Sequence, residues 1–109
     1  MEKGVRFEID YLQYIDADGV LQNPDLPDFA LDKDQLLGLY QDMVKVRAFD
    51  TKAIALQRTG KLGTYASSLG HEASHVGIGS GMQTDDVLAP SYREYGAQIV
   101  RGVKPREIL

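Results

Sequence analysis

The sequence predicts a mostly α-helical chain with one short strand near its N-terminus. Residues 33–59 carry an apolar residue at every third or fourth position, the spacing of one face of an α-helix. Two shorter segments further along begin and end with helix start and stop signals. Residues 5–15 instead alternate apolar with polar side chains, the period of a half-buried strand. We therefore divide the chain into residues 1–30, a strand and extended linker, and residues 31–109, the helical part.

The composition excludes several classes of protein. A chain of 109 residues that is 43% apolar and 26% charged has the make-up of one globular domain. Its net charge of -4 provides no basic field to hold nucleic acid, and it contains no apolar stretch of signal-peptide or membrane-spanning length. It has no cysteine, which removes disulfides, thiolate zinc sites and cysteine nucleophiles. We expect neither nucleic acid nor a membrane among its partners.

The N-terminal part is expected to be extended on both sides of a turn. Phe7, Ile9 and Tyr11 occupy alternate positions and would share one face of the strand. Gly19 closes an Asp-rich turn, since glycine readily adopts the positive φ that such turns require. Residues 23–29 contain two prolines, which disfavour helix at their own and at the preceding positions. This stretch is therefore predicted to be an extended linker.

The clearest predicted element is a long helix over residues 33–59. Asp32 is placed to cap its start, with Gln35 three residues later, and Gly60 provides the stop signal. The apolar positions form one continuous stripe that must pack against another surface. The stripe consists of Leu36, Leu39, Met43, Val46, Phe49, Ala53 and Leu56.

A second helix is predicted over residues 69–81, with Ser68 as its cap. Gly77 and Gly81 follow Ala73 at intervals of four, so the three small residues would share one face. Each glycine costs a helix interior about 1 kcal/mol relative to alanine, and this cost suggests a close backbone contact with another helix or a cofactor. The apolar run of residues 87–89 is then predicted to be a short buried strand that ends at Pro90.

Ser91 and Glu94 have the spacing of a capping box that opens a third helix, which would end at Gly102. Tyr92 and Arg93 would then lie on its first turn. A helix start presents free N–H groups and partial positive charge, and an arginine fork there suits phosphate oxygens. The alternative is an ordinary capped helix with Arg93 paired to an acidic neighbour, and spacing alone favours that reading.

The string His71-Glu72-Ala73-Ser74-His75 matches the H-E-x-x-H pattern of zinc hydrolases. Two histidines four residues apart on a helix can bind one zinc ion while the glutamate activates a metal-bound water. The glycines around this string argue against the rigid helix that such a site needs. The competing interpretation is that His71 lines a loop and His75 packs at an interface.

Four segments carry a recognisable pattern: Arg58-Thr59-Gly60-Lys61-Leu62-Gly63-Thr64-Tyr65, Ser68-Leu69-Gly70-His71-Glu72-Ala73, Ser91-Tyr92-Arg93-Glu94-Tyr95-Gly96, and residues 101–109. Together they resemble the α subunit of the pyruvate dehydrogenase decarboxylating component, a thiamine diphosphate-dependent 2-oxo acid dehydrogenase. The resemblance covers about residues 31–109. Family members are several times longer, and a last helix that starts at Pro105 has only one turn before the sequence stops. We therefore expect an N-terminal fragment.

This resemblance implies a heterotetramer of two α and two β subunits that decarboxylates a 2-oxo acid and passes the acyl group to a lipoyl-bearing acyltransferase core. It implies an α/β thiamine diphosphate-binding fold in the full-length parent. Tyr92 and Arg93 match the family pair that contacts the cofactor diphosphate, and Ser91 is included beside them. The family's magnesium ligands have no counterpart in this sequence, and no catalytic residue is assigned. The fragment alone is expected to be inactive.

The sequence departs from the family at His71, where glutamine is usual, and this departure creates the zinc-like string. Two alternatives to the cofactor-binding subunit stay open: a zinc metallohydrolase fragment that uses His71, Glu72 and His75, and a non-catalytic helical interaction module that uses the long apolar stripe. By resemblance, the substrate is pyruvate before branched-chain 2-oxo acids or acetoin. The expected location is the cytoplasm in a bacterium or the mitochondrial matrix in a eukaryote.

Overall fold

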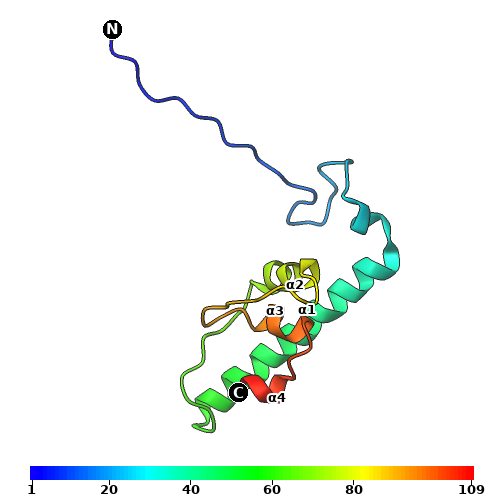
Figure 1. Cartoon of the computed structure of the whole chain (residues 1–109), viewed down its shortest axis with the longest axis vertical. Helices are drawn as coiled ribbons and strands as arrows, with labels where there is room; N and C mark the ends of the chain where they lie inside the picture. The colour runs from blue at the N-terminus through cyan, green and yellow to red at the C-terminus, as the bar shows by residue number, and fades with distance from the viewer. The chain divides into compact units, whose positions relative to one another are not determined.

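The computed structural model describes residues 1–109 and divides into two compact units, Met1–Asp32 and Lys33–Leu109. The second unit contains the four α-helices α1 to α4 (Figure 1). The mostly helical prediction is therefore confirmed.

The predicted N-terminal strand is wrong. Residues 5–12 have no regular structure, and Phe7, Ile9 and Tyr11 are each more than three quarters exposed. The only β-type pairing in the unit is an isolated antiparallel bridge between Ile15 and Leu21. An alternating pattern fits a strand only where another strand satisfies its backbone groups and a surface covers its apolar face, and neither is present.

The turn and the linker follow the sequence more closely. Gly19 has a φ of +79°, and the Asp16 side chain accepts hydrogen bonds from the N–H groups of Asp18 and Val20, both at 2.9 Å. The linker has no regular structure as far as Pro27, whose own backbone is extended, and it contains a tight turn in which the Leu26 N–H donates to the Pro24 carbonyl at 2.9 Å. It then closes into a short 3-10 helix, η1 (Asp28–Leu31). A proline just before a helix start is compatible with that turn because its φ of -65° is already near helical values.

Helix α1 (Lys33–Arg58) confirms the long predicted helix almost to the residue. Gly60 ends it with a φ of +73°, and Lys61 N–H donates back to the Leu56 carbonyl at 2.9 Å. The buried residues of α1 are Val46, Phe49, Asp50 and Ala53, all in its C-terminal half.

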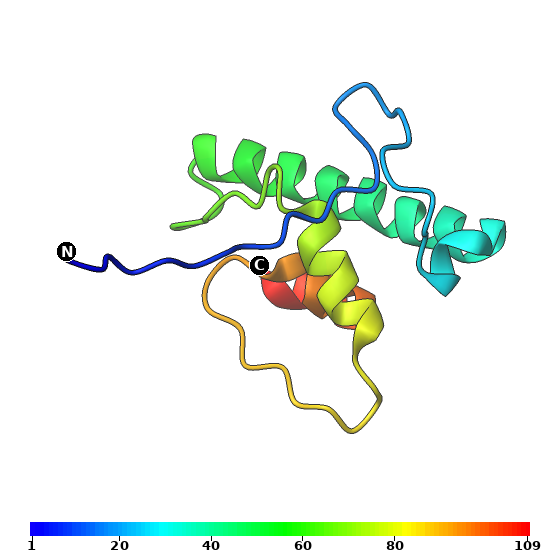
Figure 2. The ribbon, with the colours of Figure 1, turned by 90° about the horizontal axis from the view of Figure 1, so that it is seen from above.

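Three shorter helices follow α1: α2 (Glu72–Gly81), α3 (Tyr95–Val100) and α4 (Pro105–Ile108). Helices α2 and α3 pack on one side of α1 (Figure 2), and Ile108 of α4 packs against the same core. The ring of Tyr95 stacks on that of Tyr65 with centroids 5.0 Å apart, and Phe49 lies against both rings. The buried core consists of Val46, Phe49, Ala53, Tyr65, Val76 and Ile99.

The close helix contact expected from the glycines of α2 exists, but at other positions. A Cβ atom on Gly77 or Gly81 would meet nothing within 4 Å. A Cβ atom on Gly79 would lie 2.9 Å from the Ala97 carbonyl oxygen, and one on Gly96 would lie 2.9 Å from His75 Cβ. The glycines that let α2 and α3 approach are therefore Gly79 and Gly96, because α2 turns a different face towards α3 than the spacing suggested.

The structure contains no sheet. The predicted strand over residues 87–89 is an irregular segment with Val87 88% exposed. A buried strand needs neighbouring strands, and none is available to this segment. None of the helices combines the length with the apolar character that crossing a membrane requires.

Candidate functional site

The buried carboxylate of Asp50 anchors the loop that connects α1 to α2. It accepts hydrogen bonds from the Tyr65 hydroxyl at 2.8 Å, the Ser67 hydroxyl at 2.7 Å and the Ser68 N–H at 2.8 Å. Asp50 is only 3% exposed. The prediction that Ser68 caps α2 is wrong, because α2 begins at Glu72 and His71 is its N-cap residue. Ser68 instead donates its N–H and, at 3.4 Å, its hydroxyl to Asp50.

This network fixes the charge state of its members. Burial would raise the pKa of Asp50, but the hydrogen bonds from Ser68, Ser67 and Tyr65 together outweigh it, and the net pKa is lower than usual. Burial raises the pKa of Tyr65, and its hydrogen bond to Asp50 adds to that rise. Asp50 is therefore a carboxylate and Tyr65 a neutral donor at neutral pH.

Arg93 is attached to the same loop. One guanidinium nitrogen, Nη1, donates to the backbone carbonyl of Ser67, and the guanidinium carbon lies 5.3 Å from the centre of the Tyr92 ring. The hydroxyl of Ser67 is in turn held by Asp50. The structure thus brings the segment around Arg93 against a loop more than twenty residues earlier in the chain.

The predicted helix start at Ser91 is wrong. Helix α3 begins at Tyr95, and Tyr92 and Arg93 lie before it rather than on its first turn. The Ser91 hydroxyl donates to the Glu94 carboxylate at 2.9 Å and does not accept from a backbone N–H. This hydrogen bond lowers the pKa of Glu94. The two residues with the spacing of a capping box therefore bond directly to each other through their side chains.

The three predicted site residues are neighbours in the segment before α3, where Ser91 and Tyr92 are exposed and Arg93 is partly buried. Tyr92 is 67% exposed, and the guanidinium of Arg93 donates to the Ser67 carbonyl through Nη1. An arginine fork and a phenolic hydroxyl side by side can donate to the oxygens of a phosphate. Because α3 starts later than predicted and is short, the helix N-terminus is not part of this arrangement.

The zinc-site alternative is not supported. The Glu72 carboxylate accepts from Arg47 Nε and, at 2.9 Å, from the Gly70 N–H, and it is 4% exposed. Arg47 lowers the pKa of Glu72 by this hydrogen bond. The His71 and His75 rings stack with centroids 5.2 Å apart, and the chain forms no group of three or more potential metal ligands.

Two residues that hold the loop and α2 in place are not indicated by the sequence patterns. Asp50 and Arg47 lie on α1, and neither was singled out. Asp50 lies beside Phe49 and three residues before Ala53, on the buried face of the helix. A buried carboxylate requires hydrogen-bond partners. An aspartate on the apolar face of a predicted helix is therefore the sequence signal that could have indicated this network. The Glu72 partner of Arg47 is 25 residues away, and local spacing does not reveal it.

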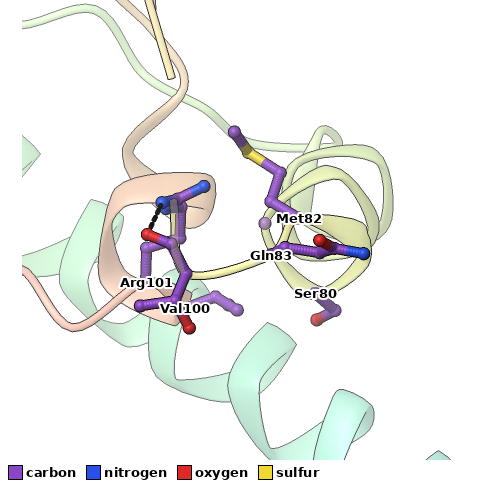
Figure 3. A pocket seen from close by; sticks show the side chains of 7 residues that line it. Ser80, Met82, Gln83, Val100 and Arg101 are labelled. Carbon is purple, nitrogen blue, oxygen red and sulfur yellow. Dashed lines mark hydrogen bonds between the residues drawn. The ribbon is translucent and has the colours of Figure 1, made fainter. Parts of the chain in front are cut away.

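A separate hollow of about 340 Å³ lies between the ends of α2 and α3. Val100 and Arg101 face Ser80, Met82 and Gln83 across it (Figure 3). Arg101 Nη2 donates to the carbonyl of Asp86 at 2.7 Å. This contact fastens the irregular segment that leads from α2 towards Ser91.

Comparison with known proteins identifies relatives along most of the chain. The 3-methyl-2-oxobutanoate dehydrogenase subunit alpha of Mycobacterium tuberculosis is 40% identical over 78 residues, which are 72% of this chain and 21% of that protein. The pyruvate dehydrogenase E1 component subunit alpha of Staphylococcus epidermidis is 37% identical over 99 residues, 90% of this chain and 26% of that protein. The protein of the same name from Mycoplasma genitalium is 36% identical over 97 residues, 89% of this chain and 27% of that protein.

The chain thus spans about a quarter of the length of these relatives. No solved structure matches it significantly. The family model of the dehydrogenase E1 component matches residues 40–109, more than half of the chain, and this range includes Asp50, Ser67 and Arg93. The chain belongs to the dehydrogenase E1 component family.

Proposed function

We propose that this chain contributes part of the α subunit of a 2-oxo acid dehydrogenase, and that Tyr92 and Arg93 bind the diphosphate of thiamine diphosphate. The observation that carries the proposal is the position of the Arg93 guanidinium, fixed on the Ser67 carbonyl and next to the exposed Tyr92. Membership of the E1 family supports the identity of the cofactor.

The residues present suit this group. Arg93 uses one N–H group on Ser67 and retains further donors in a planar fork, which matches phosphate oxygens. Asp50 holds Ser67, so the guanidinium is positioned before the ligand arrives. When bound, thiamine diphosphate supplies the electron sink for decarboxylation. Ser91 is engaged with Glu94, so we assign it the weaker role of orienting that carboxylate.

The test is a titration of thiamine diphosphate, and separately of inorganic diphosphate, into the 109-residue chain, followed by NMR of the backbone amides. We expect the shifts to centre on Tyr92 and Arg93. Arg93→Ala should weaken the binding of both ligands about tenfold to a hundredfold, since a charge-assisted hydrogen bond contributes about 1.5–3 kcal/mol. Arg106→Ala, which changes an exposed arginine on α4, is the matched control.

Melting curves without ligand separate binding from folding. Loss of the Arg93 to Ser67 hydrogen bond should lower the free energy of unfolding by about 0.5–1.5 kcal/mol. Arg93→Lys should retain part of this stabilisation. Unchanged affinity for both ligands in Arg93→Ala, with a lowered melting temperature, would restrict Arg93 to a structural role. Binding of inorganic diphosphate but not of the complete cofactor would restrict the site to phosphate recognition alone.

The substrate, the assembly and the metal are further parts of the proposal. Relatives are named for pyruvate and for 3-methyl-2-oxobutanoate, and we propose pyruvate first. The proposed partners are a β subunit, a second α subunit and a lipoyl-bearing acyltransferase, with magnesium ligands supplied by residues outside this sequence. We propose the cytoplasm as its location, since several relatives are bacterial. Assays of an enzyme that contains this chain, comparing the two 2-oxo acids, decide the substrate.

A further inference from the structure

The loop between α1 and α2 ends in a tight turn at residues 68–71. The His71 N–H donates to the Ser68 carbonyl at 2.9 Å and closes the turn. Gly70, at the third position, has a φ of +88°, a left-handed conformation that glycine adopts without strain. Ser67 immediately precedes the turn, and its carbonyl accepts the hydrogen bond from Arg93. The conformation of the turn therefore helps to set where that carbonyl lies.

All four backbone N–H groups of this turn have acceptors within the chain. The four bonds run from Ser68 to Asp50 (2.8 Å), from Leu69 to the Ser67 hydroxyl (3.2 Å), from Gly70 to Glu72 (2.9 Å) and from His71 to Ser68 (2.9 Å). Two of the acceptors are carboxylates, Asp50 on α1 and Glu72 at the start of α2. The turn therefore has no backbone donor left for an anion, and it serves the site through the Ser67 carbonyl that carries Arg93.

Glu72 is in turn held from α1. Its Oε2 atom accepts from the Gly70 N–H, and its Oε1 atom accepts from Arg47 Nε. Arg47 and Asp50 are three positions apart, so they lie on the same side of α1. Hydrogen bonding to Glu72 raises the pKa of Arg47, and the negative charge of Asp50 adds to the rise. One short stretch of α1 thus anchors the turn at its first and at its third residue.

We propose that Glu72 is a positioning residue of the diphosphate site, which fixes the turn of residues 68–71 and through it the guanidinium of Arg93. The carboxylate does not contact the ligand, since it is 4% exposed and both of its oxygens accept hydrogen bonds within the chain. A guanidinium that is ordered beforehand loses less entropy when a ligand binds. The identity of the ligand rests on the proposed function, but the ordering of Arg93 can be measured without any ligand.

Glu72→Gln separates positioning from electrostatics. Coulomb's law alone predicts that removing a negative charge near the site tightens the binding of an anion. A loosened turn predicts the opposite sign, because Arg93 must then be ordered at the expense of affinity. We expect the Kd of inorganic diphosphate, titrated into the 109-residue chain below its melting transition, to rise about threefold to tenfold in Glu72→Gln.

Asp42→Asn is the matched control for charge. It removes one negative charge from α1, but Asp42 has only a surface ion pair with Lys45. We expect the Kd of diphosphate in this variant to stay within about twofold of the wild-type value.

Glu72→Asp tests the geometry with the charge unchanged. The side chain is shorter by one methylene, so one carboxylate no longer reaches both the Gly70 N–H and Arg47. We expect the binding of diphosphate to weaken here as well, whereas a purely electrostatic role of Glu72 predicts no change. This variant also decides the matter if Glu72→Gln does not fold.

Nitrogen-15 relaxation of the Arg93 Nε–Hε group in the ligand-free chain is the second measurement. We expect an ordered side chain in the wild type and in Asp42→Asn, and one as mobile as the exposed Arg106 in the Glu72 variants. Unchanged order of Arg93, or unchanged or tighter binding of diphosphate, in the Glu72 variants would overturn the proposal. A wild-type chain that does not bind diphosphate would refute the proposed function, whereas loss of Arg93 order in Glu72→Gln would still support the positioning role.

Discussion

Replacing Asp50 with alanine should cost this chain much of its stability. The carboxylate is 3% exposed and accepts hydrogen bonds from Tyr65, Ser67 and Ser68 within 2.8 Å. Two of these partners, Tyr65 and Ser68, are themselves buried. The substitution therefore removes the common acceptor of three donors and leaves two of them inside the protein without water to replace it.

The magnitude follows from the number and type of these contacts. Each hydrogen bond to a charged group contributes about 1.5–3 kcal/mol, but contacts to one group are not additive. Loss of a partner from a buried charged network typically costs about 3–5 kcal/mol, and we expect this for Asp50→Ala. Asp50→Asn keeps the shape and one acceptor oxygen but loses the charge, so about 1–3 kcal/mol is expected. The total free energy of unfolding of a domain is about 5–15 kcal/mol, so the loss in Asp50→Ala would be a large part of it.

Urea unfolding followed by circular dichroism measures the effect. Asp42→Asn on the same helix is the control, since Asp42 has only a surface ion pair with Lys45, which contributes less than about 1 kcal/mol. The pKa of Asp50 is lowered by folding, so its stabilisation is present at neutral pH. It is lost as the pH falls below the unfolded-state value, about 4, towards the folded-state value. The difference between wild type and Asp50→Asn should shrink over that window.

Two results would contradict this reasoning. The first is an unfolding midpoint for Asp50→Ala that equals that of Asp42→Asn. The second is a difference between wild type and Asp50→Asn that stays constant from pH 7 to pH 3. Either result would mean that the loop after α1 is held by the aromatic packing of Tyr65 and not by the carboxylate.

Two further predictions concern α2. Gly77→Ala should stabilise the chain by about 0.5–1 kcal/mol, because its Cβ meets nothing within 4 Å. Gly79→Ala should destabilise it by about 1–3 kcal/mol, because its Cβ would lie 2.9 Å from the carbonyl oxygen of Ala97; equal melting temperatures for the two variants would contradict the packing of α2 on α3. Glu72→Gln should lower the stability by about 1–3 kcal/mol at neutral pH, with a smaller loss in acid because Arg47 lowers the pKa of Glu72. Thermal melts at pH 7 and pH 4 test this, and an equal loss at both values would speak against it.

The sequence by itself determined the features that depend on near neighbours in the chain. The extent of α1 follows from a run of helix-compatible residues bounded by Gly60, whose positive φ ends the helix. The start of α4 follows from Pro105. The E1 resemblance rests on four short segments, and the comparisons confirmed the family. All of these signals lie within a few residues of the structure that they specify.

Contacts between distant segments were decided only by the tertiary structure. Local spacing predicts Arg93 on the first turn of a helix, but Arg93 lies before α3, and its guanidinium is held on Ser67, 26 residues away. The alternating residues near the N-terminus have no neighbouring strand and remain irregular. Asp50 became the anchor of a loop because Tyr65 and Ser68 reach it. Local spacing defines which side chains share a face, but only folding determines what that face meets, and the free energy of a buried or charged group depends on what it meets.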